Sequence, residues 1–169
     1  QRDGESLAIT LAQVDVSAFK QMIQSSGEVI YSDEHHAKEN VKLTRPAHDA
    51  WGIKKVMFTF CDDYLQKVVD LPFSQSPQWR EHLEPIYKAI GVDEKRIVRS
   101  LLAYMPPGVK IPVHHDTGFW VKHTHRVHVP IITGPGVDFF VGANDASISK
   151  YDFSEGRTLD PNHQPNHPA

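Results

Sequence analysis

MPPGVKIPVHHDTGFWVKHTHRVHVPIIT, residues 105–133, concentrates five of the eleven histidines of the chain in short runs between prolines and glycines. The apolar, β-branched content of Lys110–His115 and His125–Ile132 predicts two β-strands. Short runs of the same kind, separated by turn residues, extend from Arg96 to Tyr151. Many short strands at this spacing are typical of a β-sandwich or a β-barrel.

The first half of the chain has a different pattern. Apolar residues on one face predict a helix over Val16–Ser25, and a second helix is predicted over 77–90, between Pro77 and Gly91. Lys55–Phe60 is an apolar run that predicts a strand. The polar segment Ser32–Gly52 has no clear period and is predicted as a long loop with a solvated His35-His36 pair.

Helical patterns followed by strand patterns predict the fold class. We expect a mostly β fold, a double-stranded β-helix of the cupin-like jelly-roll kind, with the N-terminal helices packed on one face. The length of 169 residues favours one domain over residues 1–169. Its helix-containing part would end at about residue 95, and its motif-bearing β part would begin at about residue 96.

Charge and composition narrow the function classes. The net charge of −3 gives no electrostatic case for binding nucleic acid or an anionic membrane. No apolar run approaches the roughly 18 residues that a membrane span requires. The single cysteine, Cys61, excludes an internal disulfide and lies in an apolar run, so we expect a buried thiol and a cytoplasmic protein. The sequence does not indicate an oligomeric state.

The pair His114 and Asp116 carries the first chemical signal. Residues i and i+2 of a strand point to one face, so both side chains can approach one metal ion while His115 points away. A second histidine from a distant strand would complete a set of two histidines and one carboxylate. Such a set with open positions is the usual arrangement in non-haem Fe(II) oxygenases. The alternative is a hydrogen-bonded pair without a metal.

The same spacing recurs at Arg126 and His128, with Val127 and Val129 on the other face. An arginine in a polar cavity needs an anionic partner, because an unpaired buried guanidinium is costly. A carboxylate cosubstrate suits the bidentate geometry of arginine. The alternatives are an interstrand salt bridge for Arg126 and a core position for His128. Trp120, between the two runs, either faces the substrate or packs over the cavity mouth.

The run PPG-x-x-IP-x-H-x-D-x-G at 106–118, followed by HRVHVPI-x-T at 125–133, resembles the aspartyl/asparaginyl β-hydroxylase family. Members of this family are Fe(II)- and 2-oxoglutarate-dependent oxygenases. The tail EGRTLDPNHQPNHPA at 155–169 is similar to the next landmark of the family, where an E-G step leads through an Asn-rich turn to the distal iron-ligand histidine. The resemblance extends from about Ile97 to the end of the chain.

The resemblance implies a role for each matched residue. It implies that His114, Asp116 and His167 bind Fe(II), and that Arg126 and His128 contact 2-oxoglutarate. The implied reaction uses O2 to hydroxylate a C–H bond of an amino acid, a peptide or a related small molecule, and it releases succinate and CO2. Trp120 remains a candidate for contact with the substrate.

Two departures from the family pattern bear on the substrate and on the length of the chain. Family members that act on protein domains lack the metal carboxylate, whereas Asp116 is present here, as in members that hydroxylate free amino acids such as proline. Family members also carry an arginine past the distal histidine, so we expect the native chain to be incomplete here and to continue beyond Ala169. His163 competes with His167 for the distal ligand position.

Two other functions remain open at this point. The first is a cupin-like metal-dependent enzyme that is not an oxygenase and does not need Arg126 as an anchor for 2-oxoglutarate. The second is a catalytically inactive metal-binding relative. Turnover of 2-oxoglutarate distinguishes both of them from an oxygenase.

Overall fold

The computed structural model describes residues 8–41, 46–142, 147–153 and 157–158. The chain forms two compact units, one over Val14–Ile131 and one made of Gln1–Gln13 together with Ile132–Ala169. Each unit contains its own small antiparallel sheet. Within the described ranges, no helix is long and apolar enough to cross a membrane. The single domain over residues 1–169 stays a prediction.

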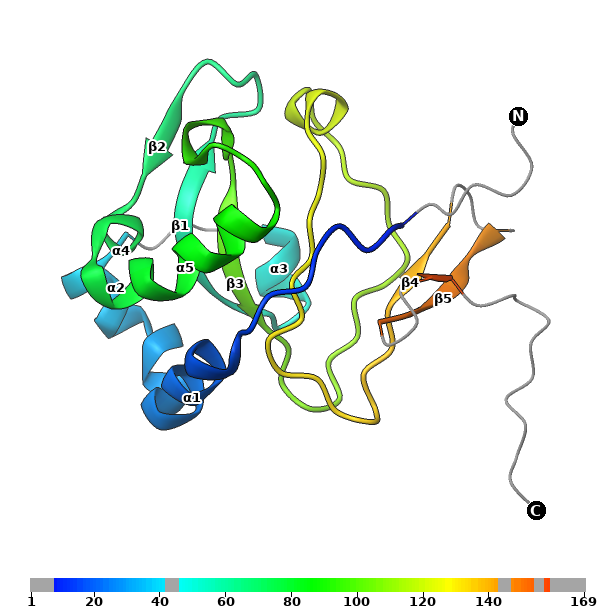
Figure 1. Ribbon diagram of the computed structural model, residues 1–169, viewed down its shortest axis with the longest axis horizontal. Helices are drawn as coiled ribbons and strands as arrows, with labels where there is room; N and C mark the ends of the chain where they lie inside the picture. Colours follow the sequence, from blue (N-terminus) through cyan, green and yellow to red (C-terminus); the bar gives the residue numbers. More distant parts are fainter. Residues whose placement is uncertain (1–7, 42–45, 143–146, 154–156, 159–169) are drawn as a thin grey trace. The chain divides into compact units, whose positions relative to one another are not determined.

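The sheet of the larger unit has β1 (Lys54–Cys61) at its centre, between β2 (Val68–Asp70) and β3 (Ser100–Tyr104) (Figure 1). Both neighbours are antiparallel to β1. A central strand covered on both faces reads as a continuous apolar run, and four consecutive residues from Val56 to Thr59 are buried. The strand predicted over Lys55–Phe60 is therefore confirmed.

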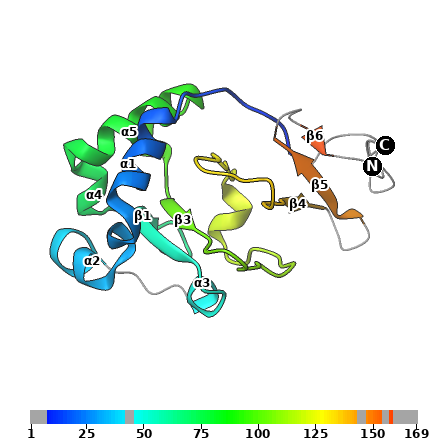
Figure 2. The ribbon, with the colours of Figure 1, turned by 90° about the horizontal axis from the view of Figure 1, so that it is seen from below.

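Helices pack against this sheet. Figure 2 shows α1, α4 and α5 together on one side of β1 and β3. The helices predicted over Val16–Ser25 and 77–90 are confirmed as α1 and α5, and Pro85 lies inside α5. Gly91 follows α5 with a φ of 67°, a left-handed conformation that suits a residue without a side chain. The helices are α1 (Ser17–Ser26), η1 (Gly27–Tyr31), α2 (Asp33–Glu39), α3 (Pro46–Ala50), α4 (Pro72–Gln75), α5 (Pro77–Ala89), η2 (Glu94–Arg96) and η3 (Trp120–His123).

The loop predicted over Ser32–Gly52 is wrong, because α2 and α3 form within it. The Ser32 side chain accepts a hydrogen bond from the backbone N–H of His35 at 3.2 Å, which caps the first turn of α2. His36 is not solvated surface either. It is 5% exposed, and its Nε2 donates to the carbonyl oxygen of Ile30 at 2.7 Å. A short helix that is capped by a side chain and buries one residue can form without the repeated apolar positions by which a longer helix is recognised in the sequence.

The core of the larger unit is aromatic. The rings of Phe58 and Trp79 lie 5.1 Å apart, and those of Phe19 and Trp79 lie 6.2 Å apart in an edge-to-face arrangement. Such pairs stabilise a core beyond the area that they bury. Val129 and Ile131 pack against this cluster, which for Val129 agrees with the predicted orientation away from Arg126. The buried cluster comprises Phe19, Ile23, Ile30, Val56, Phe58, Phe73, Trp79, Leu83 and Ile86.

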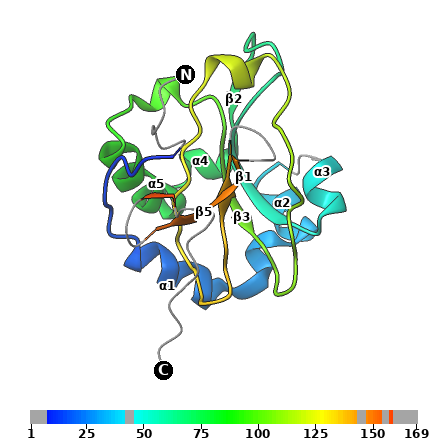
Figure 3. The same ribbon diagram turned by 90° about the vertical axis from the view of Figure 1, so that its right-hand side faces the viewer.

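The chain from Met105 to Ile131 forms two extended arms joined by η3 (Figures 1 and 3). The runs Lys110–His115 and His125–Ile132, predicted as strands, have no regular secondary structure and no ladder. Pro112 and Pro130 lie inside these runs and have no N–H to donate to a neighbouring strand. The parts of the chain that the structure describes are thus not mostly β and show no closed barrel. The jelly-roll stays a prediction.

The smaller unit has a sheet of three short strands, β4 (Phe140–Val141), β5 (Ser149–Asp152) and β6 (Arg157–Thr158), in the order β4-β5-β6. Tyr151 is buried, and its ring lies 5.2 Å from that of Phe153. The hydroxyl groups of Thr10 and Tyr151 lie 3.1 Å apart, which joins the N-terminal segment to this sheet. His163 and His167 lie outside the described residues.

Candidate functional site

Asp116 joins the two arms of the loop. On its own arm, the Oδ1 atom of Asp116 lies 3.9 Å from Nε2 of His114. Its other oxygen, Oδ2, forms an ion pair with Nη1 of Arg126 on the opposite arm. The structure therefore brings together an imidazole, a carboxylate and a guanidinium that the spacing in the sequence assigned to two polar faces. Their side chains are between 33% and 45% exposed, so the cluster is open to solvent.

The hydrogen bond of His114 fixes which ring nitrogen faces Asp116. Nδ1 lies 2.7 Å from the carbonyl oxygen of Pro112, and a carbonyl oxygen only accepts, so Nδ1 carries the proton. In the neutral ring, Nε2 then presents a lone pair on the side of Asp116. A ring N–H that donates to a backbone carbonyl is the usual support for a histidine that binds metal through its other nitrogen.

The donor set fits a metal ion in part. With bonds of about 2.1 Å, two ligands at adjacent coordination positions lie about 3 Å apart, so the 3.9 Å between His114 and Asp116 requires a small side-chain rotation. Asp116 can bind an ion through Oδ1 while Oδ2 retains its ion pair with Arg126. Among the described residues, no group of three His, Cys, Asp or Glu side chains is placed to hold a metal. The predicted third ligand, His167, lies outside them.

His128 belongs to the same electrostatic environment. Loss of hydration lowers its pKa from the ordinary value, the positive charge of Arg126 lowers it further, and the carboxylate of Asp116 opposes both effects. The residue keeps accessible surface, so protein atoms around the ring remove only part of its water. His128 is therefore held toward the neutral form, in which one ring nitrogen donates and the other accepts.

A small cavity of about 140 Å³ lies at this cluster. Asp116 and Arg126 line it together with Trp120, Val121 and Thr124. This volume is below the ~300–1,000 Å³ typical of small-molecule sites. It accommodates an ion with a few small ligands, or one end of a dicarboxylic acid, and not a whole peptide.

Trp120 is held in place from three directions. Its backbone N–H donates to the carbonyl oxygen of Asp63 at 3.0 Å, and the guanidinium carbon of Arg99 lies 4.0 Å from the centroid of its ring. Gly118 has a φ of +118°, and a Cβ there would lie 3.1 Å from two atoms of the indole. The positive φ and the close approach both favour glycine at this position. Trp120 lines the cavity, and whether it faces a substrate or packs over the cavity mouth stays a prediction.

The sequence did not point to two residues that support the cluster. Arg99 lies between the rings of Phe60 and Trp120 and donates from Nη2 to the carbonyl oxygen of Cys61 at 2.9 Å. Trp51 has its ring centroid 4.8 Å from that of His114. Arg99 is the residue before β3 and Trp51 follows α3, so neither belongs to a local motif. The thiol of Cys61 is free and buried, as predicted.

The predicted site residues thus divide into two groups. His114, Asp116, Arg126 and His128 lie on the arms, Trp120 lies in η3 between them, and these five residues line one cavity or influence one another. His167 forms the second group, because it lies outside the described residues. An imidazole, a carboxylate and a guanidinium are groups that can bind a divalent metal or a small anion. In comparisons with known proteins, the chain matches no family model, no curated protein and no solved structure.

Proposed function

We propose that this protein is an Fe(II)- and 2-oxoglutarate-dependent oxygenase that hydroxylates a C–H bond of an amino acid, a peptide or a related small molecule. One observation carries the proposal: Asp116 lies between the metal-competent nitrogen of His114 and the guanidinium of Arg126. This is the contact expected if the i, i+2 pairs of the two arms serve one centre. The motif resemblance over 106–133 supplies the choice of metal and cosubstrate.

The side chains would act as follows. His114 and Asp116 hold the ion, with His167 as the proposed third ligand. Arg126 pairs with Asp116 and offers its remaining N–H groups to one carboxylate of 2-oxoglutarate, since a guanidinium has five donors. The neutral ring of His128 can donate a hydrogen bond to the same carboxylate. When bound, iron with 2-oxoglutarate and O2 supplies the oxidising chemistry, which leaves succinate and CO2.

Trp120 and Arg99 would shape the substrate side of the cavity. The stacked guanidinium fixes the indole plane, and a fixed aromatic wall orients a C–H bond and excludes water from the centre. Because the cavity is small, a free amino acid fits the proposal better than a folded protein domain. The proposal includes a cytoplasmic location.

A second candidate function follows from the ion pair itself. Asp116 already neutralises Arg126, so Arg126 does not need a carboxylate cosubstrate as its anionic partner. The protein would then be a cupin-like metal enzyme of another class, or a metal-binding relative without turnover. In that case Fe(II) binds, but 2-oxoglutarate is not consumed.

The test measures succinate formed from 2-oxoglutarate with added Fe(II), with and without ascorbate, over a panel of free amino acids and peptides. Mass spectrometry of the panel detects the gain of one oxygen. His114→Ala is expected to abolish both signals, and the adjacent His115→Ala serves as its matched control and keeps them. Iron binding without succinate would support the second candidate, and equal loss in both variants would remove His114 from the centre.

A further inference from the structure

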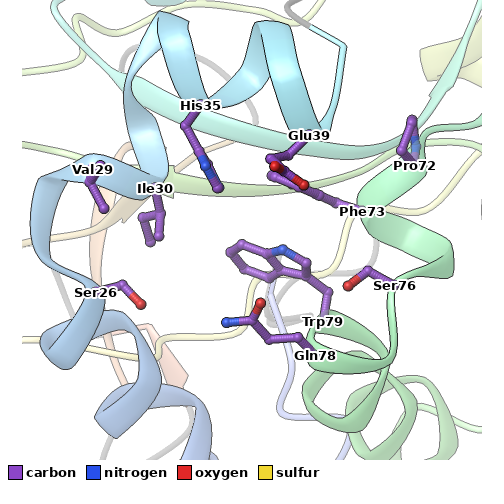
Figure 4. Close-up of a pocket in the computed structure, with 10 residues that line it drawn as sticks. All are labelled: Ser26, Val29, Ile30, His35, Glu39, Pro72, Phe73, Ser76, Gln78 and Trp79. Atoms are coloured by element: carbon purple, nitrogen blue, oxygen red, sulfur yellow. The ribbon is translucent and has the colours of Figure 1, made fainter.

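A second cavity lies among the helices of the larger unit, between α2 on one side and the start of α5 on the other (Figure 4). Its volume is about 270 Å³, close to the lower end of the ~300–1,000 Å³ range of small-molecule sites. In the close-up, His35 and Glu39 extend from α2 toward the indole of Trp79. Ser26 and Gln78 lie on the opposite side of the hollow.

Aromatic rings form one wall of this cavity. The rings of Phe73 and Trp79 stack at 5.3 Å, and the ring of His35 lies 5.2 Å from that of Phe73. Phe73 and Trp79 belong to the buried core and are 5% and 2% exposed. The wall is therefore part of the packed core and is present before any ligand binds, and each ring shows only a small part of its surface.

Among the described residues that line the cavity, Glu39 provides the only carboxylate, and no lysine or arginine is present. His35 and Glu39 are four residues apart on α2, so they share one face of that helix. Within the described part of the chain, no ion pair or side-chain hydrogen bond involves Glu39, whereas Glu34 on the same helix pairs with Lys38 at 2.7 Å. Glu39 is an exposed residue, so its carboxylate is accessible to a cation in solution.

We propose that this cavity binds a small organic cation, an ammonium group on an aryl or short alkyl body. The ammonium would lie at the carboxylate of Glu39, and the apolar body would lie against Phe73 and Trp79. Aromatic faces attract a cation within about 6 Å of the ring centroid. Ser26 and Gln78 add oxygen acceptors that suit an N–H donor.

The lining argues against other classes of ligand. An anion would meet the carboxylate of Glu39, and the described residues of the lining supply no lysine or arginine to compensate it. A divalent metal would need more hard or imidazole donors than His35 and Glu39 supply. A neutral apolar molecule would make no use of the carboxylate of Glu39. The site is distinct from the cluster at Asp116 and does not depend on the proposed iron centre.

The experiment titrates the intact 169-residue chain with three probes of the same shape and different charge. Benzylammonium, benzyl alcohol and benzoate are added separately at pH 8, and backbone amide shifts in two-dimensional NMR are followed. Saturable shifts at Ser26, Glu39 and Gln78 with benzylammonium alone are the expected result. A dissociation constant on the order of 1 mM is reasonable for so small a ligand.

Two matched variants test the role of the carboxylate. Glu39→Gln is expected to weaken benzylammonium binding by about fivefold or more, because it removes a charge-assisted contact and keeps the size of the side chain. Glu34→Gln, on the same helix but outside the cavity, is expected to leave the affinity unchanged. Equal affinity for benzyl alcohol, an unaffected Glu39→Gln variant, or shifts confined to other parts of the chain would each overturn the proposal.

Discussion

Replacing Asp116 by asparagine separates a functional role of this carboxylate from a structural one. The change keeps the shape of the side chain and removes the charge that pairs with Arg126 and faces His114. If Asp116 holds the metal, the variant loses Fe(II) binding and turnover. If Asp116 is only a structural ion pair, the variant loses stability and nothing else.

The expected change in stability follows from exposure. The side chains of Asp116 and Arg126 are 33% and 45% exposed, so solvent screens the pair. Ion pairs of this kind contribute about 0–1 kcal/mol. For a chain of this length, 1 kcal/mol corresponds to a shift in Tm of about 2–4 °C. Asp116→Asn is therefore expected to lower Tm by less than about 4 °C.

Two reference variants provide a comparison for the expected decrease in Tm. Phe58 is buried in the aromatic core, and truncating such a phenylalanine costs about 3–5 kcal/mol. Phe58→Ala is thus expected to lower Tm by about 6–20 °C. Glu84→Gln, which removes the exposed partner of Arg80 on α5, controls for the loss of a surface ion pair.

The assay combines circular dichroism melting with Co(II) absorption, in which cobalt stands in for iron. The Tm of Asp116→Asn is expected to be close to that of Glu84→Gln, and the variant is expected to lose the visible absorption bands of bound cobalt. A loss of Tm as large as that of Phe58→Ala would refute the argument, because Asp116 would then hold the arms together. Unchanged cobalt spectra would also refute it, because Asp116 would then not be a metal ligand.

Three further predictions concern Arg126, His36 and Gly118. Arg126→Ala is expected to raise the KM for 2-oxoglutarate about tenfold or more, since a charge-assisted hydrogen bond contributes about 1.5–3 kcal/mol; an unchanged KM would remove this contact. Burial lowers the pKa of His36 below its ordinary value of 6.5, so the unfolded chain binds more protons and Tm falls as pH decreases below that value. His36→Gln retains a hydrogen-bond donor for the carbonyl oxygen of Ile30 and is expected to reduce the dependence of Tm on pH, measured by melting from pH 7.5 to 5. If Tm falls as steeply with pH in the variant as in the unsubstituted protein, the prediction is contradicted. Gly118→Ala forces a Cβ against the indole of Trp120 at a φ of +118°, so the variant is expected to shift tryptophan fluorescence and lower turnover, whereas an unchanged spectrum would show that the loop adapts.

Local chemistry explains which elements could be predicted from the sequence. The helices α1 and α5 have amphipathic spacing, and α5 also has Pro77 at its start and Gly91 after its end. The central strand β1 is a continuous apolar run, which suits a strand covered on both faces. These signals act within a few residues, so they can be recognised without knowing how the rest of the chain packs.

The elements that were predicted wrongly depend on partners. α2 is polar along its length. It is stabilised by the Ser32 cap and by the buried side chain of His36, which donates a hydrogen bond to the carbonyl oxygen of Ile30. The arms at 110–115 and 125–132 have strand-like composition, but a strand needs a ladder partner, and Pro112 and Pro130 remove two donors. Composition alone does not reveal whether a partner is present.

For the candidate site, the sequence by itself determined the chemistry of the pairs. The i, i+2 spacing of His114 with Asp116, and of Arg126 with His128, follows from covalent order and an extended backbone. Only the tertiary structure decided that Asp116 meets Arg126 across the arms, that Arg99 and Gly118 fix Trp120, and that Glu39 faces an aromatic cavity. The reason is physical: a contact between distant segments depends on how both backbones pack, and no local pattern specifies that.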